Sequence, residues 1–66
     1  MNEKPKYNPN QWIHYKYGNS GQGVSRIRSI AFLKNKGWMY KVENPMSPET
    51  TMLISEKDII GKAESA

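Results

Sequence analysis

Hydrophobic and polar residues alternate along three short segments of the chain, which is the pattern of half-buried β-strands. In the first segment Ile13, Tyr15 and Tyr17 share one face, and polar or amphipathic side chains share the other. After a single helical turn, Ile59 and Ile60 supply a short closing strand. The alternating segments are residues 12–17, 38–43 and 50–54.

Residues 24–36 are compatible with two structures. Their apolar side chains recur at helical spacing, and two lysines before Gly37 are typical of a helix end. Their branched and aromatic side chains favour a strand instead, in which the three-residue step from Ile27 to Ile30 requires a bulge or bend. We favour the bent strand and an all-β fold. A helix over about residues 24–36, in an α+β fold, is the alternative.

Glycines and prolines divide the chain at three places. Residues 18–23 contain three glycines and predict a turn, and residues 34–37 predict a hairpin whose glycine is left-handed. Residues 44–49 hold two prolines and predict a loop. The expected organisation is a flexible N-terminal arm over residues 1–10, one domain over residues 11–61 and a C-terminal tail over residues 62–66.

The chain has 66 residues, no cysteine and one histidine, and this composition excludes several classes of protein. A chain of this length forms one domain, without room for a cofactor-binding α/β sheet. His14 has no second histidine or cysteine as a partner, so we expect no enzyme, no metal site and no cofactor. No segment has the ~20 apolar residues that span a bilayer. We therefore expect a cytoplasmic protein without a membrane partner.

The net charge of +4 is unevenly distributed. Residues 1–41 hold eight basic residues and one acidic residue, whereas residues 42–66 hold two basic and five acidic residues. A basic segment with interleaved aromatic rings is typical of surfaces that stack bases and neutralise phosphates. The same residue types also dominate protein–protein hot spots. The candidate binding residues are Trp12, His14, Lys16, Arg26, Arg28, Lys34, Lys36 and Trp38.

Three segments resemble parts of a known family. Residues 10–13, Asn-Gln-Trp-Ile, lie where SH3-like barrels often have Gly-Asp-x-Val, and residues 23–30 match their Gly-x-x-x-Ile-x-x-Ile second strand. Residues 54–59 are similar to their closing Val-x-x-x-Asp-Leu. The chain therefore resembles the SH3-like small β-barrels, which include Tudor-like and KOW-type modules. This resemblance implies a five-stranded antiparallel barrel with a short helical turn before the last strand.

Small barrels of this kind are often accessory proteins of bacteria and their phages, and the resemblance implies a non-catalytic binding module. The basic, aromatic half of the chain favours nucleic acid as the partner. The alternative is a protein-interaction module that docks on a larger macromolecular complex. A homodimer that completes its own core is a further hypothesis, because the chain is short and has no disulfide or metal to stabilise it.

Overall fold

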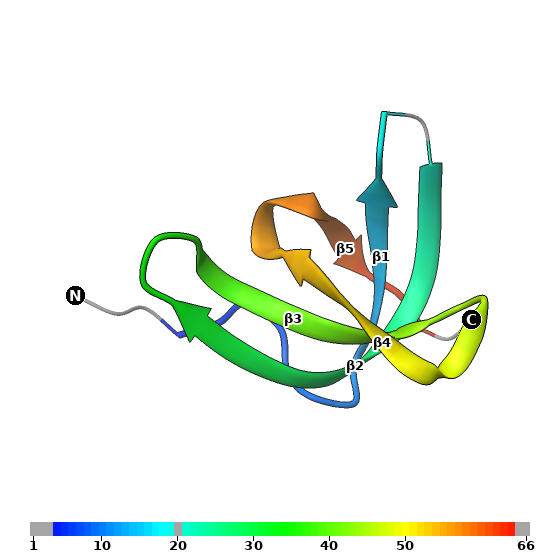
Figure 1. Cartoon of the computed structure of the whole chain (residues 1–66), viewed down its shortest axis with the longest axis horizontal. Helices are drawn as coiled ribbons and strands as arrows, with labels where there is room; N and C mark the ends of the chain where they lie inside the picture. The colour runs from blue at the N-terminus through cyan, green and yellow to red at the C-terminus, as the bar shows by residue number, and fades with distance from the viewer. Residues whose placement is uncertain (1–3, 20, 65–66) are drawn as a thin grey trace.

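The structure is a computed structural model that describes residues 4–19 and 21–64, and its five strands form one antiparallel sheet (Figure 1). The strand order is β4-β3-β2-β1-β5. The all-β fold with a short helical turn before the last strand is therefore confirmed. The elements are β1 (Trp12–Tyr17), β2 (Gly21–Leu33), β3 (Gly37–Asn44), β4 (Ser47–Ser55), the 3₁₀ turn η1 (Glu56–Asp58) and β5 (Ile59–Lys62).

The long strand β2 organises the sheet, and the alternative helix over residues 24–36 is wrong. The first half of β2 pairs with β1, and its second half pairs with β3. The register shifts between Ile27 and Ser29, which leaves Arg28 as the extra residue of a β-bulge. This bulge confirms the bend expected between Ile27 and Ile30. The bulge also explains the helix-like spacing of the apolar residues in this segment. Inward-facing residues of β2 have odd numbers before Arg28 and even numbers after it.

The sheet bends but does not close, which corrects the prediction of a closed barrel. Within the described residues β4 pairs only with β3, and β5 pairs only with β1. The turn η1 separates the two edge strands, and β5 has only four residues. Ile54 of β4 and Ile59 of β5 both belong to the same hydrophobic core.

Two tyrosines of β1, the buried Tyr15 and the exposed Tyr17, lie against glycines of β2. Tyr15 pairs with Gly23, and a Cβ atom at Gly23 would lie 2.8 Å from the Tyr15 hydroxyl oxygen. Tyr17 pairs with Gly21, where a Cβ atom would overlap the Tyr17 ring. These two glycines therefore belong to β2, and the predicted turn over residues 18–23 is shorter than expected. Residue 20 lies outside the described residues.

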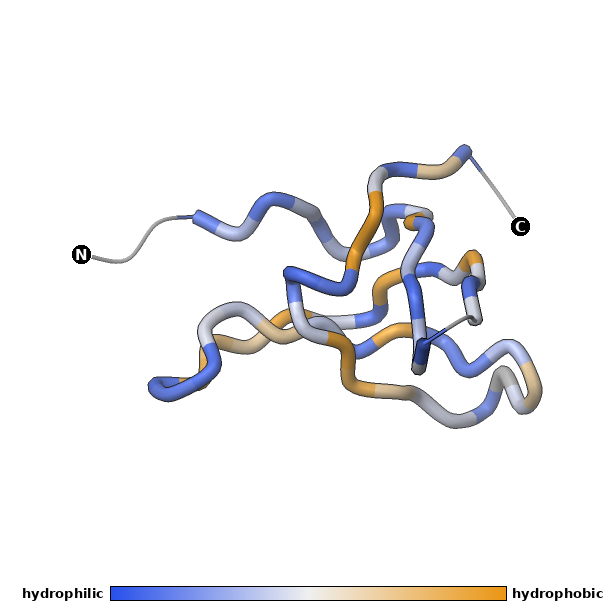
Figure 2. The backbone as a smooth tube through the Cα atoms, turned by 90° about the horizontal axis from the view of Figure 1, so that it is seen from above, coloured by the Kyte–Doolittle hydropathy of each residue, from blue (hydrophilic) through white to orange (hydrophobic). Residues whose placement is uncertain are grey.

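The other two connections are tight turns. The tip of the β2–β3 hairpin is hydrophilic (Figure 2). Gly37, which follows it, has the expected left-handed conformation with φ of 81°. The loop predicted over residues 44–49 is a two-residue turn at Pro45 and Met46 between β3 and β4. Pro48 falls within β4, an edge strand, where a missing N–H group is tolerated. In the described part of the chain, no helix is long and apolar enough to cross a membrane.

The segment before β1 contacts the sheet at several points. The Asn10 N–H donates to the Ile27 carbonyl at 2.7 Å, and the Ile27 N–H donates to the Gln11 carbonyl at 2.9 Å. Tyr7 packs edge-on against Tyr40, with ring centroids 5.8 Å apart. Packed structure thus begins before residue 11. The flexibility of the N-terminal arm and of the C-terminal tail stays a prediction, and residues 1–3 and 65–66 lie outside the described residues.

Candidate functional site

The outer face of β1 and the first half of β2 brings together four of the eight predicted binding residues, which are Trp12, His14, Lys16 and Arg26. Cross-strand partners in an antiparallel pair share one face of the sheet. The pairs are Trp12 with Arg26, His14 with Val24 and Lys16 with Gln22. None of these six side chains is acidic, and His14 and Lys16 are exposed. We call these six residues the β1–β2 face.

Trp12 and Arg26 form a cation–π contact at one end of this face. The guanidinium carbon of Arg26 lies 5.9 Å from the centroid of the Trp12 ring. Such a contact contributes about 0.5–1 kcal/mol at an exposed site. Trp12 is half-buried, so the indole is held against the sheet while part of its surface stays open to solvent.

Arg26 and Arg28 share one carboxylate, that of Glu43 in β3. Arg26 donates to Glu43 Oε2 from Nε at 3.2 Å and from Nη2 at 2.9 Å, and Arg28 donates from Nη1 at 3.1 Å. The hydrogen bonds from Arg26, helped by the charges of both arginines, hold the pKa of Glu43 below its usual range. The cluster keeps a net charge of +1, and the Arg28 side chain is 53% exposed.

The remaining predicted residues lie at the far end of β2, in the β2–β3 hairpin. Lys34 lies eight positions after Arg26, just beyond the end of β2. The extended chain between the two residues spans up to about 26 Å at the usual rise of a β-strand. Trp38 packs against the core, and its ring lies 5.0 Å from that of Phe32 in an edge-to-face arrangement. The eight candidate residues are therefore divided between two surfaces.

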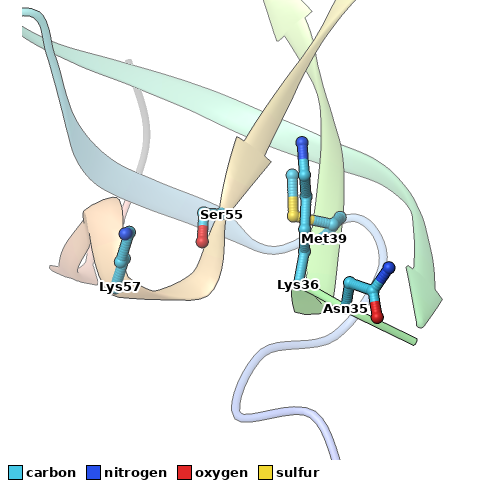
Figure 3. Close-up of a pocket in the computed structure, with 5 residues that line it drawn as sticks. All are labelled: Asn35, Lys36, Met39, Ser55 and Lys57. Atoms are coloured by element: carbon cyan, nitrogen blue, oxygen red, sulfur yellow. The ribbon is translucent and has the colours of Figure 1, made fainter. Parts of the chain in front are cut away.

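A pocket of about 380 Å³ opens at this second surface (Figure 3). Its lining includes Lys36, a predicted residue, and Lys57 from η1, which sequence reasoning assigned to the acidic part of the chain. Only the fold brings these two lysines together, so no local sequence signal could have indicated the pair. We call it the Lys36/Lys57 pocket, and its lining residues are Asn35, Lys36, Met39, Ser55 and Lys57.

A third surface follows the open edge of the sheet between β1 and β4. An uncharged pocket of about 360 Å³ lies there, and a second one of about 280 Å³ adjoins it with Asp58 in its lining. Tyr17 and Met46 are largely exposed beside the uncharged pocket. We call this surface the apolar seam, and the uncharged pocket is lined by Tyr15, Tyr17, Asn44, Pro45, Met46 and Met52.

No protein-family model matches the chain, and comparisons with curated proteins and with solved structures give no significant match. Membership of the SH3-like family therefore stays a prediction. Among the residues that the structure describes, no three His, Cys, Asp or Glu side chains gather as metal ligands would. The three surfaces themselves are the basis for assigning a function.

Proposed function

We propose that the protein is a non-catalytic domain that binds single-stranded nucleic acid through the β1–β2 face. The observation that supports this most directly is the register of β1 and β2. It puts the Trp12 indole beside the Arg26 guanidinium, with Lys16 further along the same face and no acidic side chain among the six. The proposal includes a cytoplasmic location, and a homodimeric state stays a hypothesis.

The chemistry of the face suits a strand whose bases are accessible. Stacking of a base on an aromatic side chain contributes roughly 1–3 kcal/mol per base, and Trp12 supplies such a ring. Lys16 and the exposed N–H groups of Arg28 can neutralise phosphates on either side of the stacked base. A guanidinium has five N–H donors, so the bond to Glu43 leaves most of those on Arg28 available.

The test measures binding of a fluorescently labelled, 5′-hydroxyl ten-nucleotide strand by anisotropy at several salt concentrations. We expect a salt slope of about −1.4, from about −0.7 for each of the two phosphates that Lys16 and Arg28 neutralise on a single strand. Trp12→Ala should weaken binding by about tenfold through the loss of stacking. Lys16→Ala should weaken it less. Lys34→Ala, at the hairpin tip, is the matched control and should leave the affinity unchanged.

Two results would overturn the proposal. One is the absence of binding to DNA and RNA strands at low salt. The other is an equal loss of affinity in Lys34→Ala and Lys16→Ala, which would indicate diffuse attraction by any lysine. Because Trp12 is half-buried, Trp12→Phe serves as a second variant that keeps a stacking ring, and thermal unfolding of each variant identifies any loss of fold.

A second candidate function, docking on a protein, is favoured by the apolar seam. The lining of its larger pocket is uncharged, and Met46 is 91% exposed beside it. That pocket offers nothing to a phosphate and suits an extended peptide with apolar side chains. The partner would be a segment of a larger macromolecular complex.

Tyr17→Ser tests this second candidate, because Tyr17 is exposed and its loss leaves the core intact. A defined protein retained from nuclease-treated lysate by the wild type but not by Tyr17→Ser supports docking at the seam. Equal retention by both proteins rules the seam out as the docking surface. Trp12→Ala should not affect this retention, which separates the two candidate functions.

A further inference from the structure

The Lys36/Lys57 pocket is assembled from three parts of the chain. Met39 and Ser55 are cross-strand partners in β3 and β4, and Met39 is 7% exposed at the inner wall. Lys36 rises from the hairpin beside Met39, and Lys57 rises from η1 on the other side of Ser55 (Figure 3). The lining thus includes one methionine, two lysines, one serine and one asparagine.

The acidic neighbours of Lys57 are directed to other parts of the molecule. Glu56 Oε2 accepts a hydrogen bond from the Tyr40 hydroxyl at 2.6 Å and another from the Lys6 N–H at 3.1 Å. Asp58 lines the smaller pocket of the apolar seam. Neither carboxylate is part of the lining of the Lys36/Lys57 pocket. Glu56 and Asp58 flank Lys57 in sequence, but in the fold only Lys57 of the three lines this pocket.

The two lysines also lack partners elsewhere in the described structure. Within residues 4–19 and 21–64, the ion pairs join Arg26 and Arg28 to Glu43, and neither Lys36 nor Lys57 forms one. Two lysine side chains therefore line one concave site whose lining contains no carboxylate. An anionic ligand would supply the missing charge.

We propose that the Lys36/Lys57 pocket binds the phosphomonoester group of a nucleotide. A phosphomonoester carries a charge of about −1.5 to −2 at neutral pH, which two ammonium groups match, and its oxygens accept hydrogen bonds from hydroxyl and amide donors. Lysine is a common point-charge ligand for phosphate. The volume of about 380 Å³ lies near the small end of the roughly 300–1,000 Å³ of small-molecule sites, so it suits one nucleotide unit.

The phosphate can come from a free nucleotide or from the end of a nucleic-acid strand. Only the second source rests on the proposed function, since it requires that a strand binds the β1–β2 face. The two sites use different residues, and the proposed function is tested with 5′-hydroxyl strands. A failure at one site is therefore distinguishable from a failure at the other.

The experiment is an NMR titration of the ¹⁵N-labelled protein with a nucleoside 5′-monophosphate, the corresponding nucleoside and inorganic phosphate, at low ionic strength. We expect the monophosphate to shift the backbone amides of Met39, Ser55 and Lys57. Inorganic phosphate should shift the same amides at higher concentration, and the nucleoside should shift none. Lys36→Ala and Lys57→Ala should each weaken monophosphate binding by about tenfold, since each removes a charge-assisted contact.

Lys34→Ala is the matched control, because Lys34 lies at the same hairpin tip but does not line the pocket. Unchanged binding in this control supports the proposal, and an equal loss in all three variants overturns it. A phosphoserine peptide that binds more tightly than the monophosphate overturns the choice of a nucleotide. Tighter binding of a 5′-phosphorylated strand than of its 5′-hydroxyl form, lost in Lys57→Ala, identifies the strand end as the source. If the 5′-phosphorylated strand binds no more tightly than its 5′-hydroxyl form, the source is the free nucleotide.

Discussion

The two basic surfaces differ in how the protein treats its own positive charge. On the β1–β2 side, Arg26 and Arg28 converge on Glu43, which is only 18% exposed, so one of their two charges is cancelled within the fold. At the hairpin end, Lys36 and Lys57 share a pocket that no carboxylate lines. The arginines therefore form a partly neutralised cluster, whereas the two lysines share a pocket without a carboxylate in its lining.

This difference shows that the net charge of a sequence segment does not give the net charge of a surface in the folded protein. Glu43 belongs to the acidic part of the sequence but neutralises arginines of the basic part. Lys57 belongs to the acidic part but adds to a basic pocket. The excess of positive charge is thus weaker than expected on one surface and stronger on the other.

The largest effect is expected from Tyr40→Phe, which removes the group that holds Glu56. Tyr40 is fully buried, and burial together with the hydrogen bond to Glu56 raises the pKa of its hydroxyl. Loss of a hydrogen bond to a charged group should lower the free energy of unfolding by roughly 1.5–3 kcal/mol, measured by urea denaturation. Released from Tyr40, Glu56 can approach Lys57, so monophosphate affinity should also fall.

Tyr15→Phe is the control for this prediction. Tyr15 is equally buried, but its hydroxyl meets the neutral Ser25 hydroxyl at 3.3 Å, so a smaller loss of roughly 0.5–1.5 kcal/mol is expected. Equal losses in the two variants would contradict a special role for the Tyr40–Glu56 bond.

Asn35→Asp should make the hairpin surface resemble the arginine cluster. It adds a carboxylate at the pocket beside Lys36, and aspartate is as compatible with a turn as asparagine is. We expect monophosphate affinity to fall by about tenfold, because the new charge competes for the two lysines. Calorimetric titration or NMR measures the change. Asn19→Asp, in the exposed β1–β2 turn, introduces the same charge elsewhere, and a comparable fall there would refute a localised site.

Glu43→Gln should make the opposite change on the β1–β2 side. It frees both arginine charges with almost no change of shape, so affinity for a 5′-hydroxyl strand should rise by about threefold at low salt. The salt slope should steepen by about 0.7, which corresponds to one more neutralised phosphate. Glu49→Gln removes an equal charge from the edge strand β4. If the two variants behave alike, the gain reflects net charge and not the arginine cluster.

The smallest effect is expected from pH. Because Arg26 and Arg28 lower the pKa of Glu43 from its ordinary value of 4.5, the cluster stabilises the fold above that value. The stabilisation should be lost as the pH falls through the lowered pKa, where Glu43 takes up a proton. Thermal unfolding of the wild type and Glu43→Gln should therefore differ at pH 7 and converge in strong acid. A difference that persists unchanged at the lowest pH would contradict this account.

The sequence predicted the parts of the fold that depend on local pattern. Alternation is a property of neighbouring residues, and Ile13 and Tyr15 are both fully buried as it indicated. The left-handed glycine at Gly37 follows from a short hairpin in the same way. Both features are determined by neighbouring residues and do not depend on the rest of the chain.

Features that depend on partners across the sheet were missed. Gly21 and Gly23 suggested a turn, but they are small because the rings of Tyr17 and Tyr15 lie over them. The bond between Arg26 and Glu43 joins residues 17 positions apart, and no spacing rule connects them. The candidate residues were therefore identified by type, whereas their division between two surfaces required the fold.

The bulge at Arg28 restricts which changes in chain length the protein can tolerate. Ile27 faces inward before it, and Ile30 faces inward after it. Substitution of Arg28 would remove a charge and a hydrogen bond to Glu43, but deletion of that one residue would reverse the orientation of every later side chain in β2. Ile30 would then turn to solvent and Leu33 to the core. Insertions and deletions in β2 should therefore destabilise the fold more than substitutions do.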